Sequence, residues 1–229
     1  MTHRLIQTED GSCTIYVPEL DEHYHSIHGA IQESRHIFIQ AGLIHYLSHP
    51  PQSFSATSPL NILEAGFGTG LNAYLTLLES ERLGIPINYH SLEKYPLTIP
   101  EITVLDYPEQ LGQTDRSLFQ KLHHTPWNTA SRITPFFQLR KYHQDFREIT
   151  FRETFDLVYF DAFNPKVQPH LWTPEVLERF AQALKAGGIL VTYCVKGSVK
   201  QALRASGMTL RRLPGPPGKR EMLRATKQA

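Results

Sequence analysis

The sequence predicts an α/β fold in which helices cover both faces of a mainly parallel sheet, a Rossmann-like architecture. Two observations lead to this prediction. From residue 61 onward, short strand-like runs alternate with helical stretches, and this order favours parallel strands joined by crossover helices. The first of these strands also runs directly into a glycine-rich turn, EAGFGTGLN at 64–72, as is typical of doubly wound sheets.

We expect seven strands in this sheet, at 62–65, 87–92, 136–142, 155–160, 189–194, 209–213 and 220–225. The last two follow each other across the short loop LPGPPGK, which leaves no room for a crossover helix. They must therefore pair as a hairpin, and one of them runs antiparallel to the rest.

Two helices are marked by apolar residues at helical spacing, one over 71–78 and one over 177–184. The second has the sequence signals of both ends: Thr173 as N-cap, Pro174 at the first helical position and Gly187 just past the end. Both helices are expected to pack against the sheet.

We expect residues 1–58 to form a small extension ahead of a main domain at 59–229. The segments 4–8 and 13–17 flank Asp10-Gly11, a strong hairpin signal. A helix is expected from about residue 26 to about residue 47. Pro50-Pro51 and the polar stretch FSATSP then mark a connection to the main domain.

Composition favours a soluble globular protein, with 41% hydrophobic and 20% charged residues. No apolar run approaches the roughly 20 residues that span a bilayer, and the start has no basic segment followed by an apolar one. Cys13 and Cys194 form neither a disulfide framework nor a metal-type spacing. We expect a cytoplasmic protein with reduced thiols and no membrane anchor.

The net charge of +1 conceals a strong asymmetry. From residue 196 onward there are nine Lys or Arg and one acid, a local net of +8, while the rest carries 14 basic and 21 acidic residues, a net of −7. The C-terminal region is the natural place for a polyanion such as nucleic acid, although a solvated basic tail has the same composition.

The glycines of the first turn let the backbone approach a ligand closely, and the following helix offers free N–H groups. Their spacing favours E/D-x-G-x-G-x-G, the pattern of S-adenosylmethionine (SAM) methyltransferases. The dinucleotide fingerprint would need its third glycine where this chain has Leu71. The expected cofactor contacts here are Glu64, Gly66, Gly68, Gly70 and Asn72.

Carboxylates follow three further strands. Glu93 is placed to accept both ribose hydroxyls, or else pairs with Lys94 at the surface. Asp145 is placed to accept the exocyclic amine of adenine, or else caps a turn. Asp161 follows the strand 155–160 and would lie beside the methyl group of SAM. The carboxyl ends of parallel strands meet at one edge, so these residues belong to one site.

Asp161 is the candidate catalytic residue as well as a cofactor contact, because a carboxylate here can accept the hydrogens of an amine and aim its lone pair at the methyl group. Alignment of nucleophile and sulfonium then supplies much of the rate, without a metal. A nearby carboxylate also favours the ammonium form, so a proton must leave first, and the sequence does not name its acceptor. The alternative role is that of a turn or helix cap.

Several blocks resemble the tRNA 5-methylaminomethyl-2-thiouridine methyltransferase family: DEHYHSIHGAIQESRHIFIQAGL (21–43), ILEAGFGTGLN (62–72), YHSLEKYPL (89–97), FDLVYFDAFNPKVQPHLWTPE (155–175) and KREML (219–223). The resemblance implies a class I SAM-dependent methyltransferase that methylates the 5-aminomethyl group of the wobble uridine in tRNA. Some bacteria fuse this activity to a flavin-dependent oxidase. We expect the stand-alone form, with oxidase activity on no part of this chain.

The resemblance also assigns residues. It places Gly66, Gly68, Gly70, Glu93 and Asp145 at the cofactor and Asp161 beside the amine. It places Tyr24 and Glu33 in the pocket. Phe163 and Trp172 are expected to stack on the uracil or to pack under the loop. Arg211, Arg212, Lys219 and Arg220 are expected to contact phosphates of the anticodon stem, although the loop before KREML is more Pro-rich than the family pattern.

The histidines His23, His25, His28 and His36 lack carboxylate or cysteine partners at a recognised spacing, so no metal is expected. Two other functions remain open. A nicotinamide-dependent oxidoreductase is disfavoured by Leu71. A non-catalytic RNA-binding module is disfavoured by the presence of Asp161 and Glu93.

Overall fold

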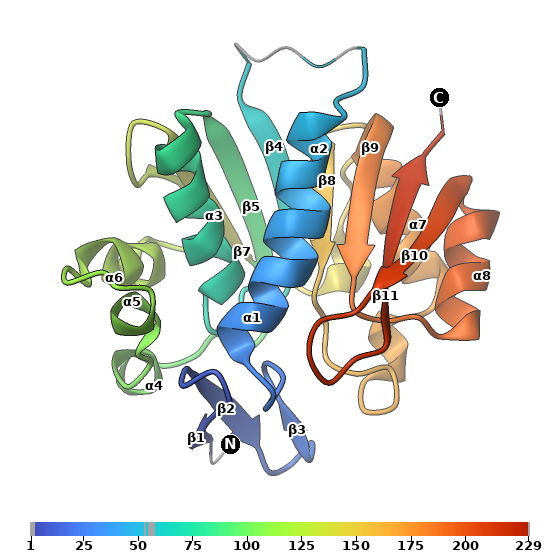
Figure 1. The fold of residues 1–229 in the computed structure, drawn as a ribbon. Coiled ribbons are helices and arrows are strands. Elements are labelled where there is room, and N and C mark those ends of the chain that lie inside the picture. Colours follow the sequence, from blue (N-terminus) through green and yellow to red (C-terminus); the bar gives the residue numbers. More distant parts are fainter. Residues whose placement is uncertain (1–2, 53, 55–57, 229) are drawn as a thin grey trace.

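The computed structural model describes residues 3–52, 54 and 58–228. Its main sheet has the strand order β10-β11-β9-β8-β4-β5-β7-β6 (Figure 1). The parallel strands are β4 (Leu60–Ala65), β5 (Ile87–Glu93), β7 (Phe137–His143), β8 (Phe155–Phe160) and β9 (Leu184–Thr192). The strands β11 (Glu221–Lys227), β10 (Met208–Pro214) and β6 (Ala130–Arg132) each run antiparallel to the neighbour they join.

The predicted fold class and the C-terminal hairpin are confirmed, but the sheet has eight strands where seven were expected. The additional strand, β6, has three residues at the sheet edge, none of them buried, so it carries no apolar pattern. The strand β9 also begins at Leu184, five residues before the predicted start at 189. Gly187 therefore lies inside β9, with φ 76°, where the pairing with β8 shifts register.

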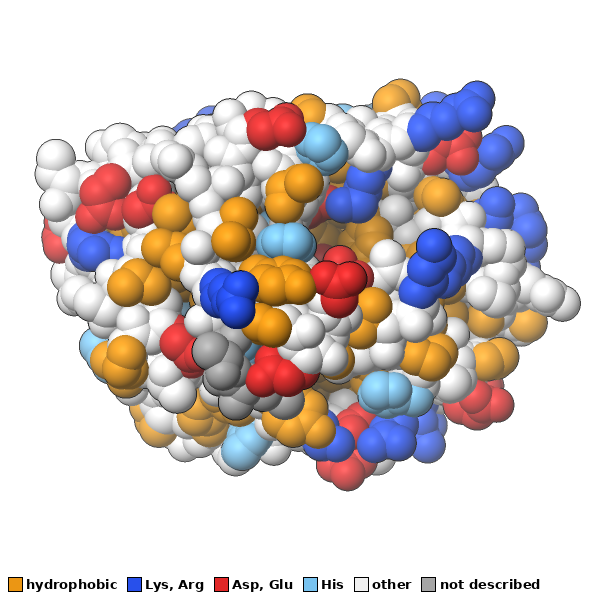
Figure 2. Space-filling view, turned by 90° about the horizontal axis from the view of Figure 1, so that it is seen from below, with side chains coloured by type: hydrophobic (Ala, Val, Ile, Leu, Met, Phe, Trp, Pro, Cys, Tyr) orange, Lys and Arg blue, Asp and Glu red, His pale blue; other side chains and the backbone are white. Residues whose placement is uncertain are grey.

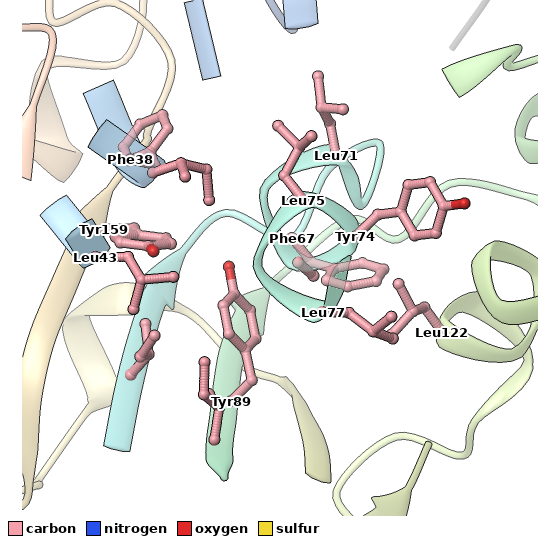
Figure 3. Close-up of a cluster of buried hydrophobic side chains, with 14 of the residues drawn as sticks. Phe38, Leu43, Phe67, Leu71, Tyr74, Leu75, Leu77, Tyr89, Leu122 and Tyr159 are labelled. Atoms are coloured by element: carbon pink, nitrogen blue, oxygen red, sulfur yellow. The ribbon is translucent and has the colours of Figure 1, made fainter. Parts of the chain in front are cut away.

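Helices cover both faces of the sheet. The helix α3 (Leu71–Leu83) lies on one face, and α7 (Pro174–Ala183) and α8 (Gly197–Ala205) lie on the other, where Thr173 is the N-cap of α7 as predicted. Shorter helices fill the connections: α4 (Ile99–Thr103), α5 (Tyr107–Gln110), α6 (Ser117–His124), η2 (Phe146–Glu148) and η3 (Pro169–Leu171). Each face buries its own hydrophobic cluster, and Figure 3 shows the one beneath α3.

The predicted N-terminal helix is a continuous helix of three parts: α1 (Ala30–Ser34), the wider π-helical η1 (Arg35–Ile44) and α2 (His45–Ser48). It begins four residues later than expected, after Gly29 with φ 135°. It lies beside α3 on the same face, where Phe38 packs on Tyr159 with ring centroids 5.2 Å apart (Figure 3). This helix thus belongs to the main core.

Ahead of this helix, a three-stranded sheet lies below the carboxyl ends of the parallel strands (Figure 1). It contains β1 (Arg4–Gln7), β2 (Cys13–Val17) and the unpredicted two-residue β3 (Glu22–His23). The predicted hairpin is present, closed by a longer loop in which the Thr8 N–H donates to the Ser12 carbonyl at 2.8 Å.

The division of the chain at residue 58 stays a prediction, and much of the connection FSATSP lies outside the described residues. Among the residues described, no helix is long and apolar enough to cross a membrane.

Gly42 sets how closely the N-terminal helix approaches the sheet. A Cβ there would stand 3.2 Å from side-chain carbons of Tyr159 and Val191. We expect Gly42→Val to lower the free energy of unfolding by about 1–3 kcal/mol, because the added methyl groups overpack this contact. Gly197→Val is the matched control, since a Cβ at exposed Gly197 meets nothing within 4 Å. Denaturant unfolding measures both, and equal losses would contradict the prediction.

Candidate active site

A cavity of about 560 Å³ opens at the carboxyl ends of the parallel strands. Its floor is the glycine-rich turn, its walls come from the segments after β5, β7 and β8, and its roof comes from the N-terminal segment 22–28. Figure 2 looks onto this end of the molecule, where the surface is hollowed between acidic, basic and histidine side chains. The predicted strand-end residues therefore meet in one pocket.

The glycine turn is shaped by contacts that exclude a side chain. Gly66, with φ 96°, lies where a Cβ would be 2.8 Å from the carbonyl oxygen of Asp161. Gly68, with φ 48°, lies where a Cβ would be 2.8 Å from the Tyr24 ring. Both glycines line the pocket. Gly70 does not line it; it precedes α3 with φ 74° and packs against His123.

Glu64 and Asn72, predicted together as cofactor contacts, have different surroundings. Glu64 is fully buried and is absent from the pocket wall. It accepts a hydrogen bond from the Ser91 hydroxyl at 2.6 Å, and burial raises its pKa well above the ordinary value. Asn72 lines the pocket, and its buried Oδ1 atom has no hydrogen-bond partner among the described residues.

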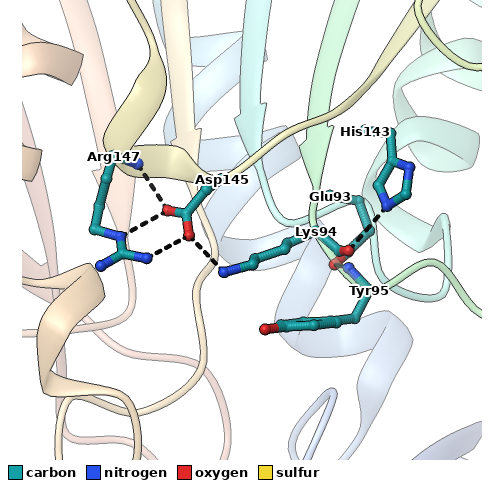
Figure 4. Close-up of polar contacts among 6 residues, drawn as sticks. All are labelled: Glu93, Lys94, Tyr95, His143, Asp145 and Arg147. Atoms are coloured by element: carbon teal, nitrogen blue, oxygen red, sulfur yellow. Dashed lines mark hydrogen bonds and ion pairs between the residues drawn. The ribbon is translucent and has the colours of Figure 1, made fainter.

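Glu93 lies in the pocket wall at the end of β5. Its carboxylate accepts the backbone N–H of Gly68 at 3.0 Å. It also accepts the backbone N–H of Tyr95 at 2.8 Å, and Figure 4 draws these two residues. Burial raises its pKa. The surface pair between Glu93 and Lys94, which the sequence left open, does not form, because the Lys94 ammonium bonds to Asp145 instead.

Asp145 also lines the pocket, but its carboxylate is already occupied (Figure 4). It accepts the backbone N–H and the guanidinium of Arg147 at 2.8–3.0 Å, and the ammonium of Lys94 at 2.9 Å. The Arg147 guanidinium holds the pKa of Asp145 well below its usual range. Asp145 thus caps the turn η2, and a bound adenine would share its carboxylate with these two cations.

Asp161 stands at the end of β8, half-buried in the pocket. Its Oδ2 atom accepts the side-chain N–H of Asn72 at 2.8 Å, and its own N–H donates to the Ala65 carbonyl at 3.1 Å. Burial, with a smaller contribution from the Glu33 carboxylate, raises the pKa of Asp161 to about 7, against the opposing effects of Asn72 and Lys219. The carboxylate can therefore both hold and release a proton near neutral pH.

Two of the three predicted aromatic residues line the pocket, and the third packs beneath the loop that carries Phe163. Tyr24 and Phe163 line the pocket, edge to face, with ring centroids 4.9 Å apart. Trp172 is absent from the lining and is 5% exposed. Its indole N–H donates to the Phe163 carbonyl at 2.7 Å, and its ring packs 4.8 Å from Phe160. Of the two roles left open for Trp172, the structure shows packing beneath the loop.

The C-terminal basic residues do not form one surface. Lys219 points into the pocket and pairs with Glu33. Arg211 and Arg212 are exposed and are successive residues of β10, so they face opposite sides of the sheet. Arg212 pairs with Glu221 at 3.3 Å, and Arg220 is exposed in the loop before β11.

Two further residues contribute to the site: Tyr193, which the sequence reasoning missed, and His25, one of the histidines for which it expected no metal. Tyr193 follows β9, lines the pocket and donates its hydroxyl hydrogen to the Ala162 carbonyl at 2.7 Å. His25 is buried and bonds through Nε2 to the Thr69 hydroxyl at 2.7 Å, which ties the roof to the glycine turn. Neither residue belongs to a recognisable motif, although His25 lies within the block 21–43.

Known proteins that resemble this chain are SAM-dependent methyltransferases and tRNA-modifying proteins. Residues 124–228 match a family described as S-adenosyl-L-methionine-dependent methyltransferase. The bifunctional protein MnmC of Delftia acidovorans, named for tRNA 5-methylaminomethyl-2-thiouridine biosynthesis, is 28% identical over 93% of this chain and 33% of its own length. MnmC of Nitrosospira multiformis is 27% identical over 91% of the chain and 34% of its length. The chain thus spans about a third of these relatives.

Solved structures agree with the sequence matches. MNMC2 from Aquifex aeolicus superposes with a TM-score of 0.78 at 25% identity, over 100% of this chain and 71% of the other. Spermidine synthase from Thermotoga maritima, with a TM-score of 0.56 at 14% identity over 99% of this chain and 72% of the other, shares the fold alone. In sequence and in fold, this chain therefore resembles the methyltransferase domain of MnmC, as its sequence blocks predict.

Proposed function

We propose that this protein is a SAM-dependent enzyme that methylates the nitrogen of the 5-aminomethyl group on the wobble uridine of tRNA. The observation that carries the proposal is the meeting of Glu93, the glycine turn and Asp161 in one pocket of an MnmC-like chain. Neither a nicotinamide-dependent nor a non-catalytic function gains support from the site or from the similar proteins. A tRNA substrate implies a cytoplasmic location.

The pocket residues fit SAM. Gly66 and Gly68 bring bare backbone to the pocket floor, and Asn72 lines the pocket beside them. Glu93 would hold the ribose hydroxyls, exchanging its bonds to backbone N–H groups for bonds to the ligand. Asp145 would lie at the adenine. When bound, SAM supplies an electrophilic methyl group on a positively charged sulfur.

Asp161 would accept the proton that the substrate must lose. A primary ammonium has no lone pair, so one N–H bond must break, with the proton passing to the Asp161 carboxylate and the electron pair staying on nitrogen. The pKa of about 7 suits this exchange. Since this pKa is raised, Asp161 is mainly protonated below pH 7 and becomes available as a base above it.

The uracil ring would lie against Tyr24 and Phe163, whose ring faces and edges border the pocket. Stacking of a base on an aromatic side chain contributes about 1–3 kcal/mol. Trp172 would act indirectly, by holding the backbone that carries Phe163.

The tRNA backbone would approach along the side of the C-terminal strands. Lys and Arg side chains gather on the right of Figure 2, which is the side of β10, β11 and α8 in Figure 1. Arg220 and Arg212 would contact phosphate there, while Arg211 faces the other side of the sheet.

The reaction is tested by nucleoside mass spectrometry after incubation of the protein and SAM with tRNA that carries 5-aminomethyluridine. We expect conversion to the methylaminomethyl nucleoside. Asp161→Asn should slow it at least about a hundredfold, because the variant cannot accept the proton. Asp115→Asn is the control, the same change at an exposed carboxylate. No conversion by wild type would refute the substrate, and normal conversion by Asp161→Asn would remove this residue from the mechanism.

Cofactor binding is tested separately by calorimetry with SAM and with NADH. We expect Glu93→Ala to weaken SAM binding about tenfold to a hundredfold, because it loses charge-assisted hydrogen bonds to the ribose. Glu178→Ala, at an exposed position of α7, should leave it unchanged. Binding of NADH in preference to SAM would contradict the cofactor assignment.

The proposed tRNA surface is tested by the salt dependence of binding. The double variant Arg212→Ala, Arg220→Ala should reduce the slope of log affinity against log salt by about one for each phosphate that the protein no longer neutralises. The control removes the same charge near the amino ends of the parallel strands, away from the pocket. It combines Arg82→Ala at the end of α3 with Arg152→Ala before β8. An equal change in both pairs would place the tRNA elsewhere.

A further inference from the structure

An ion pair crosses the pocket between two distant parts of the chain. The Lys219 ammonium, from the loop between β10 and β11, bonds to the Glu33 carboxylate on α1. Its Nζ atom also lies 5.0 Å from the centre of the Tyr193 ring. The other oxygen of Glu33 accepts the Ser26 N–H at 2.8 Å, and only 9% of the Glu33 side chain is exposed. Both partners are therefore fixed in place.

This pair lies at the Asp161 end of the pocket, which all three residues line together with Tyr193. The other titratable groups that face Asp161 are Glu64 on β4, Tyr89 on β5 and Tyr193 after β9. Burial raises the pKa of each of these three groups well above its ordinary value. Glu33 and Lys219 are the side chains whose charge shifts the pKa of Asp161.

We propose that the Glu33–Lys219 ion pair is a positioning element for methyl transfer, which sets the charge around Asp161 and so fits this end of the pocket to a cationic amine. The inference rests on the proposed function, because it assigns these residues a part in that reaction. Neither side chain needs to touch the reacting atoms. Each acts through the pKa of Asp161, which Glu33 raises and Lys219 lowers.

The physical reason is the balance of charge. Glu33 disfavours a second negative charge at Asp161, which raises its pKa, whereas Lys219 favours that charge and lowers the pKa. Without Glu33, Asp161 would be ionised down to a lower pH, but its lower pKa would make it a weaker base towards the ammonium. Without Lys219, more of Asp161 would be protonated before the substrate arrives, and only the ionised fraction could act as a base.

Three variants separate this role from a structural one: Glu33→Gln, Lys219→Met and the double variant. Glutamine can still accept the Ser26 N–H, and methionine keeps the length of the lysine side chain. The carboxyl carbon of Asp161 is titrated by NMR in the free protein, with its signal assigned from Asp161→Asn. The dependence of kcat/KM on pH is then measured with tRNA that carries 5-aminomethyluridine.

We expect Glu33→Gln to move the Asp161 titration to lower pH by about one unit and Lys219→Met to move it to higher pH by a similar amount. The double variant, which restores the charge balance, should return close to wild type. The rising limb of kcat/KM should shift in the same directions. A merely structural role would shift both single variants alike, or neither, and either result would overturn the proposal.

The two proposals can fail separately. If wild type does not methylate the tRNA, the proposed function is wrong, whatever the NMR titration shows. If wild type methylates it and the single variants show no opposed shifts in the Asp161 titration, only the role of the ion pair is wrong. Circular dichroism and SAM calorimetry on each variant confirm that a missing shift does not reflect unfolding.

Discussion

The site depends on the register of β4 with its two neighbours. Ala65, the last residue of β4, pairs with Leu92 on β5 and with Phe160 on β8. Because all three strands run in the same direction, the next residue of each, Gly66, Glu93 and Asp161, emerges at the same height of the sheet. A shift of one residue in either pairing would move a carboxylate away from the glycine turn and reverse which side of the sheet it faces. The pocket is thus a consequence of strand alignment.

That alignment brings acidic groups close together, which has an electrostatic cost. Glu64 and Asp161 lie within electrostatic range of each other, and Glu33 approaches Asp161 from the helix side. Burial raises the pKa of Glu64 well above its ordinary value, Glu33 pairs with Lys219, and the pKa of Asp161 is raised to about 7. The same crowding that destabilises three carboxylates equips one of them to exchange a proton.

The sequence predicted those parts of the fold and site that follow from local pattern. Strand-end placement of Glu93 and Asp161 needed only the alternation of strands and helices, and the sharp turn needed only glycine spacing. The sequence did not reveal the bond between Glu33 and Lys219, which are 186 residues apart, or that Arg147 and Lys94 occupy Asp145. Such contacts depend on how loops fold back over the sheet, and no periodicity encodes that. Trp172 was ambiguous for the same reason, because its role depends on which side of a loop it faces.

The small N-terminal sheet has a consequence for how the pocket is controlled. Directly after β3, Tyr24 packs against Gly68 and His25 bonds to Thr69. The conformation of the glycine turn therefore depends on the position of the roof above it. A substitution of Tyr24 or His25 therefore acts on the glycine turn without altering any residue of that turn.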